Sequence, residues 1–267
     1  MKKTKISILV GTMLILSLLG TNVLAVSESN QKSNKEKVIY QKDEIQDLTE
    51  IKSRAEMGIT DDPQFKSNDV LSNEANNKTS NNQVPNVKKI KNVTSQKVKE
   101  TILEDGSIRT EFVGNALVTL DTPVFEDSSS TRWDSNGKVQ YRLRICYYRY
   151  FGGTYDRYNV TSIQGTLLSI GTNVNVTKIK LQYDYLGKCF SSTGTAYGSK
   201  HEYSSYESTT NLGININHLI QMPTTYYYEV TGVDHVSNRC TVYITNTSTK
   251  SSYTDYVDVG FGSWVSW

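Results

Sequence analysis

The spacing of hydrophobic residues divides this chain into a short helical segment and a long region of strands. Between residues 35 and 57 apolar side chains recur at intervals of three to four positions, with one longer step, and charged residues fill the gaps. This spacing predicts one amphipathic helix. Gly58 is a suitable end for the helix, and Asp61-Asp62-Pro63 opposes its continuation.

From residue 99 onward apolar and polar residues alternate, as in strands with one buried face. Asp105-Gly106 is a tight-turn dipeptide between two such runs and predicts a β-hairpin. A change of phase near Thr177-Lys178 predicts a bulge, and Asn217–Met222 favours a helical turn. The remaining strand candidates, separated by turn residues, are 116–120, 138–151, 158–170, 174–186, 212–216, 226–233, 240–245 and 253–261.

Strands with one apolar face must bury that face against another layer. We therefore expect an all-β fold over residues 99–267, an antiparallel two-sheet β-sandwich of about nine or ten strands. Residues 26–65 form a polar N-terminal segment that contains the helix near 35–57. Residues 66–98 are rich in Asn, Ser and Lys with few large apolar side chains, which predicts a disordered linker.

The first 25 residues have the pattern of a secretory signal peptide. Three lysines lie among the first five residues, an uncharged stretch covers residues 6–19, and Ala25 ends the segment. We expect cleavage after Ala25, a secreted extracellular product, and no integral membrane span after cleavage. An uncleaved anchor is the alternative, and residues 26 to about 90 are either a removable pro-segment or a plain disordered extension.

Composition places the core in the C-terminal part of the chain. The sequence has 18 tyrosines, and all but Tyr40 lie between Tyr141 and Tyr256. The formal net charge is only +2, and basic residues form no cluster of the kind that neutralises phosphates. Nucleic acid is therefore not an expected partner.

Two tyrosine-rich runs suggest a binding surface, because adjacent strand residues point to opposite faces and some of these rings should be exposed. The runs are Tyr147–Tyr150 and Tyr226–Tyr228. Exposed tyrosines and neighbouring arginines are suited to a glycan or a cell-surface protein. The residues expected to form this surface are Arg142, Arg144, Tyr148, Tyr150 and Tyr227. The alternative is that the rings only stabilise the sheet.

No catalytic or metal-binding motif stands out. His201, His218 and His235 are the only histidines, they form no zinc-type pair, and we expect them on different loops. No Gly-x-Ser-x-Gly elbow occurs. We predict no catalytic residue, no metal ligand and no cofactor, and expect binding rather than catalysis, with an undetected extracellular hydrolase as an open alternative.

Three cysteines in an exported chain permit one disulfide. Strand phase places Cys146 on the polar face of its strand, whereas Cys189 and Cys240 share the apolar phase of theirs. The phase favours a bridge between Cys189 and Cys240. The alternative is three buried thiols.

Ser191–Thr210 is dominated by Ser, Thr, Gly and Tyr, and in this composition it resembles the pore-forming hairpins of the aerolysin-like toxins. That resemblance implies a secreted membrane-active toxin, or a bacteriocin, as the main alternative function. A membrane-inserting hairpin alternates apolar and polar residues along each arm, and this tract has almost no apolar side chains apart from Tyr. We therefore expect a long flexible surface loop here.

Overall fold

The computed structural model describes residues 36–67, 88–127, 130–151, 154–222, 225–248, 250 and 252–263. The predicted signal peptide, residues 1–25 with cleavage after Ala25, lies outside the described residues. Most of the predicted linker, residues 68–87, also lies outside them.

Antiparallel strands dominate the described part of the chain, together with one short helix, α1 (Leu48–Glu56). The twelve strands are β1 (Lys37–Gln41), β2 (Lys66–Ser67), β3 (Lys88–Ile102), β4 (Ile108–Asp127), β5 (Ser130–Phe151), β6 (Arg157–Ile170), β7 (Val174–Phe190), β8 (Ala196–Ser208), β9 (Asn217–Gln221), β10 (Tyr227–Glu229), β11 (His235–Asn246) and β12 (Ser252–Gly262). No helix among the described residues is long and apolar enough to cross a membrane.

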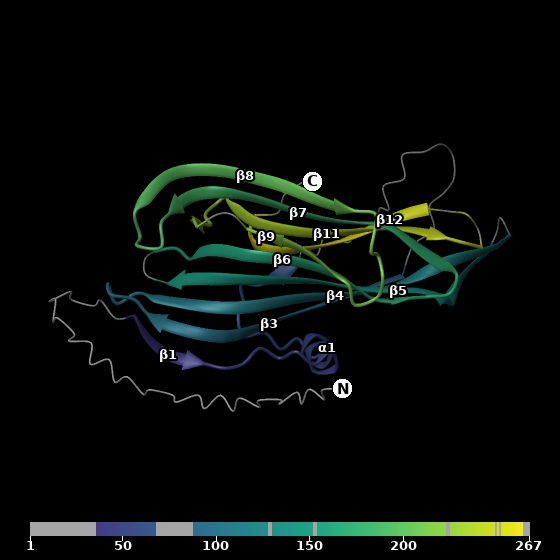
Figure 1. Cartoon of the computed structure of the whole chain (residues 1–267), viewed down its shortest axis with the longest axis horizontal. Coiled ribbons are helices and arrows are strands. Elements are labelled where there is room, and N and C mark those ends of the chain that lie inside the picture. The colour runs from purple at the N-terminus through teal and green to yellow at the C-terminus, as the bar shows by residue number, and fades with distance from the viewer. Residues whose placement is uncertain are drawn as a thin grey trace, which may run out of the picture. The chain divides into compact units, whose positions relative to one another are not determined.

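Backbone hydrogen bonds join all twelve strands into one sheet, whereas the sequence led us to expect two. The order is β1-β3-β4-β5-β6-β10-β7-β11-β12-β2, with β8 paired to β7 and β9 paired to β6. Figure 1 shows β7, β8 and β11 running beside one another, and α1 and β1 next to β3. The neighbouring strands β5 and β6 form one candidate site together with the end of β12, which is distant from both in this order.

The helix is shorter than predicted, because the first part of the expected helical segment is strand β1, paired to β3. Asp47 caps α1 by accepting a hydrogen bond from the amide of Thr49 at 2.7 Å. Gly58 follows with a φ of +68°, so the predicted helix end is correct. Ile51 and Ala55 bury the apolar side of α1.

Strand β3 begins at Lys88, inside the stretch that the composition assigned to a disordered linker. Its polar residues Thr94, Ser95 and Gln96 are buried, and the segment around α1 satisfies their hydrogen bonds. The Ser95 hydroxyl accepts from the Asp62 amide at 2.8 Å, and the Gln96 side chain bonds Ile45 and Asp43. Composition failed here because it cannot register such long-range partners.

Several local predictions are correct. The chain turns at Asp105-Gly106 to form the β3–β4 hairpin, in which Ile102 pairs with Ile108. The register of β7 with β11 shifts between Tyr243 and Ile244, opposite Thr177, where the phase change predicted a bulge. Three local predictions are wrong: 217–221 is strand β9 rather than a helical turn, 196–208 is strand β8 rather than a flexible loop, and 212–216 contains a turn and no strand.

The core contains apolar side chains from strands that are not neighbours in the sheet. Leu120 and Val139 from β4 and β5 belong to the same buried cluster as Ile179 from β7 and Val257 from β12. From Ile179 to Cys189 on β7 the odd positions are buried and the even positions are more exposed, as the alternation predicted. The polar face of β7 is therefore available for chemistry outside the core.

Candidate functional site

The predicted tyrosine surface exists as a cluster, but it is closed. Tyr150, Phe190 and Tyr227 are only 6%, 5% and 5% exposed, and Tyr148 packs against them. We call these four residues the outer tyrosine cluster. The guanidinium of Arg157 lies 3.4 Å from the ring centroid of Phe190 and 5.6 Å from that of Tyr150. Tyr150 and Tyr227 are therefore buried rather than exposed, because the guanidinium of Arg157 and neighbouring rings pack against this cluster. Binding through the five residues that the sequence selects stays a prediction.

Arg142 and Arg144 lie on the same strand but do not join the tyrosines. Arg144 forms two hydrogen bonds to the Glu44 carboxylate, at 2.9 and 2.6 Å, so the segment before α1 already occupies it. Burial lowers the pKa of Arg142, and the nearby charge of Arg144 acts in the same direction. The five residues that the sequence grouped together thus belong to two separate environments.

The three cysteines are free thiols, and the predicted bridge between Cys189 and Cys240 is not formed. Cys240 on β11 is opposite Leu181 of β7, while Cys189 lies eight positions further along β7. Eight strand residues span about 26 Å, and a disulfide requires Cα atoms within about 7 Å. Burial raises the pKa of both thiols.

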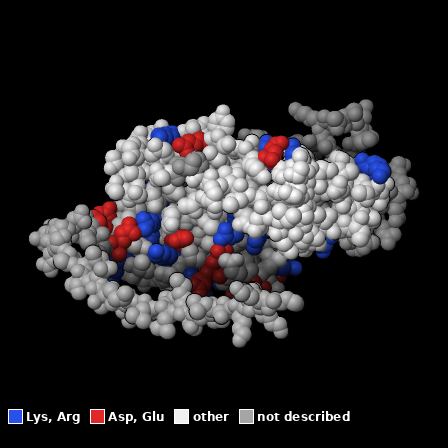
Figure 2. Space-filling view, in the orientation of Figure 1, with Lys and Arg blue, Asp and Glu red and all other residues white. Residues whose placement is uncertain are grey.

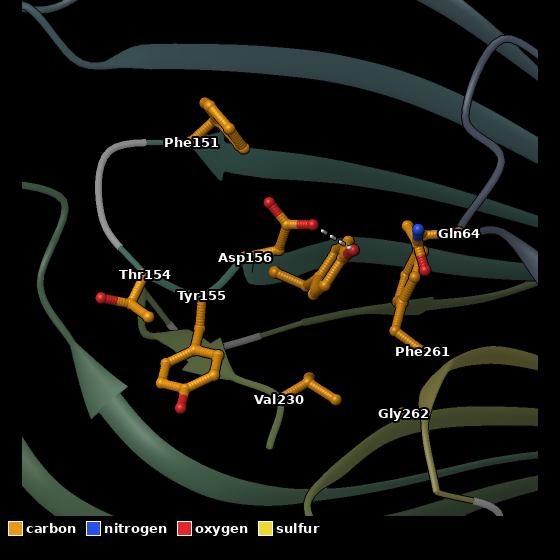
Figure 3. Close-up of a pocket in the computed structure, with 9 residues that line it drawn as sticks. Gln64, Phe151, Thr154, Tyr155, Asp156, Val230, Phe261 and Gly262 are labelled. Carbon is orange, nitrogen blue, oxygen red and sulfur yellow. Dashed lines mark hydrogen bonds between the residues drawn. The ribbon is translucent and has the colours of Figure 1, made fainter. Parts of the chain in front are cut away.

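A cavity of about 340 Å³ opens at the other face of β5, where the strand ends. Its walls come from the end of β5, the residues that lead into β6, the segment after β10, the end of β12 and the loop before β2 (Figure 3). We call it the inner pocket. Its lining residues are Gln64, Phe151, Thr154, Tyr155, Asp156, Tyr158, Val230, Phe261 and Gly262.

Aromatic rings form both the floor and the rim of the inner pocket. Tyr158 and Phe261 are buried and stack with ring centroids 3.8 Å apart and planes 10° apart. Phe151 and Tyr155 are 60% and 52% exposed. Two rings are therefore fixed by the core, and two more are accessible from solvent. Such an arrangement offers flat apolar surfaces to a ligand.

A charged network lies behind the pocket and joins it to the core. The guanidinium of Arg149 bonds Asp62 through Nη1 at 3.0 Å and Asp156 through Nη2 at 2.6 Å. The Tyr147 hydroxyl donates to the other Asp62 oxygen at 2.9 Å. Burial raises the pKa of Asp62, while the Tyr147 hydrogen bond and the Arg149 charge oppose that rise. Asp62 is fully buried and acts as a structural anchor for Arg149.

Asp156 is the acidic group that faces the pocket. Its Oδ2 atom accepts the bond from Arg149 and lies 3.5 Å from the Tyr158 hydroxyl (Figure 3). Its Oδ1 atom has no hydrogen-bond partner among the described residues. Arg149 holds one oxygen of this carboxylate, and the other is a buried acceptor without a donor, which the hydroxyl of a ligand that reached it would satisfy.

The sequence reasoning did not select Phe151, Tyr155 or Asp156. In the sequence Gly152-Gly153 is a turn-type dipeptide, and Phe151 and Thr154 on either side of it line the pocket. Aromatic residues that flank a glycine-rich turn were the available signal. That they would meet Gln64 and Phe261 depended on the fold, which the local pattern does not encode.

Charged side chains on the face shown in Figure 2 include both signs close together, and most of the described surface in that view is uncharged. Several pairs form ion pairs, among them Arg157 with Glu229 at 3.2 Å and Lys178 with Glu207 at 3.3 Å. No protein-family model matches this chain, and neither a curated protein nor a solved structure is significantly similar to it.

Proposed function

We propose that this protein is an extracellular, non-enzymatic binding protein whose inner pocket recognises a sugar unit of a glycan. One observation carries the proposal: two exposed aromatic rings, Phe151 and Tyr155, line the same pocket as Asp156, whose Oδ1 atom is buried and has no hydrogen-bond partner among the described residues. The signal-like pattern of the first 25 residues supports a location outside the cell.

The chemistry of a sugar ring fits these groups. Its C–H faces pack against aromatic rings, and its hydroxyl groups donate hydrogen bonds to a carboxylate. The cavity of about 340 Å³ falls at the lower end of the range for small-molecule sites. Arg149 fixes the Asp156 carboxylate before a ligand arrives, which reduces the entropy lost on binding.

We also propose that the single sheet folds over itself into the two-layer sandwich that the strand pattern predicts. Contacts between distant strands support this. A Cβ atom on Gly165 of β6 would lie 2.8 Å from Cδ2 of Leu181 and 3.2 Å from Sγ of Cys240. The Tyr141 hydroxyl of β5 donates to Asp255 of β12. This packing would hold the pocket walls from β5, β6 and β12 in place.

A glycan array tests the proposal, with the full-length secreted protein compared with Phe151→Ala and Tyr155→Ala. Both side chains are more than half exposed, so the variants should fold normally. We expect the wild type to bind a defined set of glycans, and each variant to lose about tenfold or more in affinity. Tyr203→Ala is the matched control, since that ring is 73% exposed on β8, away from the pocket lining. Equal loss in the control, or no glycan bound by the wild type, contradicts the proposal.

Membrane activity is a second candidate because of the length of two strands. β4 and β5 contain 20 and 22 residues and pair from Ile108 with Phe151 to Asp127 with Ser130. Strands in globular proteins are usually about five or six residues long, and about ten span a bilayer. Release of a dye from liposomes tests this candidate. Leakage by the wild type without any glycan binding would reverse the order of the two proposals.

A further inference from the structure

Three metal-ligating side chains meet on the polar face of β7, remote in sequence from one another. Asp184 comes from β7, His201 from β8 and His235 from β11. β7 lies between the other two strands, and both histidines are opposite Leu186 in the register. The sequence predicts these histidines on different loops. That prediction is wrong for His201 and His235, which lie on strands that pair with β7.

The ligand atoms are close enough to share one ion. Nε2 of His201 lies 2.7 Å from Oδ1 of Asp184, and Nε2 of His235 lies 3.0 Å from the same oxygen. One ligand atom from each residue falls within 4.8 Å of the other two. Zinc bonds of about 2.0–2.2 Å place tetrahedral ligands about 3.3 Å apart, so shifts of a few tenths of an ångström suffice for Asp184 and each histidine.

The surroundings orient these ligands. Nδ1 of His235 lies 3.4 Å from the carbonyl oxygen of Val233, a contact of the kind that turns Nε2 of a ligating histidine toward its metal. The side chains of Asp184 and His235 are 15% and 11% exposed, whereas that of His201 is 50% exposed. Two ligands are therefore held by the sheet, and the third faces solvent, where an ion could enter and water could complete its coordination.

We propose that Asp184, His201 and His235 form a binding site for a divalent transition-metal ion of the zinc class. Two imidazoles and one carboxylate suit Zn²⁺ and its neighbours, whereas Mg²⁺ and Ca²⁺ prefer sites made of oxygen ligands. The site does not depend on the proposed sugar binding, because its ligands share no residue with the inner pocket.

The bound ion would act as a staple for β8. Among the described strands β8 pairs only with β7, and nearly all of its side chains are partly or fully exposed. A metal held by His201 and His235 would connect β8 to β11, with which β8 shares no backbone pairing. We expect Zn²⁺ to slow amide hydrogen exchange in residues 196–208 more than in β4.

The test is isothermal titration of the full-length protein with Zn²⁺, with Mg²⁺ as the oxygen-preferring comparison. We expect one Zn²⁺ per chain and no saturable Mg²⁺ binding. His201→Gln should lower the zinc affinity by about tenfold or more. This variant keeps the core intact because His201 is half exposed. His235→Gln and Asp184→Asn should have the same effect where circular dichroism shows a native fold.

Two control variants make the result specific. His218→Gln removes the histidine that lies outside the cluster, and Cys146→Ser removes the half-buried thiol, a competing zinc ligand. Both should keep wild-type zinc affinity. Absence of saturable zinc binding by the wild type would overturn the proposal, and so would equal affinities for the wild type and His201→Gln. In either case Asp184 only forms hydrogen bonds to the two histidines, and the cluster is not a metal site.

Discussion

The two faces of β5 near its end carry similar side chains but differ in what covers them. On one face Tyr150 belongs to the outer tyrosine cluster, which Arg157 and neighbouring rings close against water. On the other face Phe151 lines the inner pocket and is 60% exposed, and Arg149 bonds the Asp156 carboxylate from behind that pocket. A tyrosine-rich sequence therefore indicates the position of aromatic clusters, and only the tertiary fold decides which cluster is open to a ligand.

The largest loss of stability should come from truncating a buried ring of the outer tyrosine cluster. Tyr227→Ala removes a 5% exposed ring that contacts Tyr150 edge-on, with centroids 6.1 Å apart. Loss of a buried aromatic ring costs about 3–5 kcal/mol, so the free energy of unfolding should fall by that amount. Urea unfolding measures it, with Tyr155→Ala as the exposed comparison. A cost below about 1 kcal/mol would mean that the outer tyrosine cluster is not part of the core.

Removing the positive charge of Arg149 should cause the next largest loss of stability. Arg149→Met leaves the buried Asp62 carboxylate without its cation and frees Asp156. Breaking such a pair from one side costs about 3 kcal/mol at neutral pH. The double variant Arg149→Met with Asp62→Asn should recover part of that stability. If the double variant is no more stable than the single one in urea unfolding, the Arg149–Asp62 interaction is not the source of the loss.

A smaller effect is the change in folding stability with pH that Asp62 should cause. Burial raises its pKa in the folded state above the ordinary value of 3.8, so the folded protein holds this proton more tightly than the unfolded chain. The contribution of Asp62 to stability is therefore greatest below pH 3.8 and declines as pH rises through the folded-state pKa. Asp62→Asn cannot ionise and should lack this decline.

Urea unfolding at a series of pH values from acid to neutral measures the effect as the stability of Asp62→Asn minus that of the wild type. This difference should shift in favour of the variant as pH rises. A shift in favour of the wild type would show that Tyr147 and Arg149 outweigh the cost of burial, and that the pKa of Asp62 is lowered rather than raised.

The smallest change in stability should come from truncating Phe151, the exposed ring at the inner pocket. Phe151→Ala should alter the free energy of unfolding by no more than about 0.5 kcal/mol, because the ring is mostly in water. The same substitution should still weaken glycan binding. A loss of several kcal/mol would place Phe151 in the core and remove the contrast between the two faces of β5.

Much of the strand pattern was predictable, because alternation and turn residues are local properties. The hairpin at Asp105-Gly106 and the bulge near Thr177 follow from a few neighbouring residues. Strand β3 was not predictable in the same way, since its buried polar residue Ser95 is stabilised by partners more than 30 positions away. Polar strands with distant hydrogen-bond partners have the composition of linkers.

The candidate sites were less predictable than the strands. The tyrosine runs identified a true cluster, but exposure depends on Arg157 and on cross-strand neighbours, which no local pattern supplies. The inner pocket joins Phe151 to Phe261, and the metal-ligating cluster joins His201 to His235 through β7. Both depend on sheet order, because the strands that meet are separated by other elements in the sequence.

The central claim is that a sugar binds at the inner pocket and not at the outer tyrosine cluster. The most direct test is a titration of ¹⁵N-labelled protein with the glycan that binds best on the array, followed by amide chemical-shift mapping. The account predicts the largest shifts at Thr154, Tyr155, Asp156 and Gly262, with little change at Tyr148 and Tyr227. Shifts centred on Tyr148 and Tyr227, with none around Asp156, would contradict it.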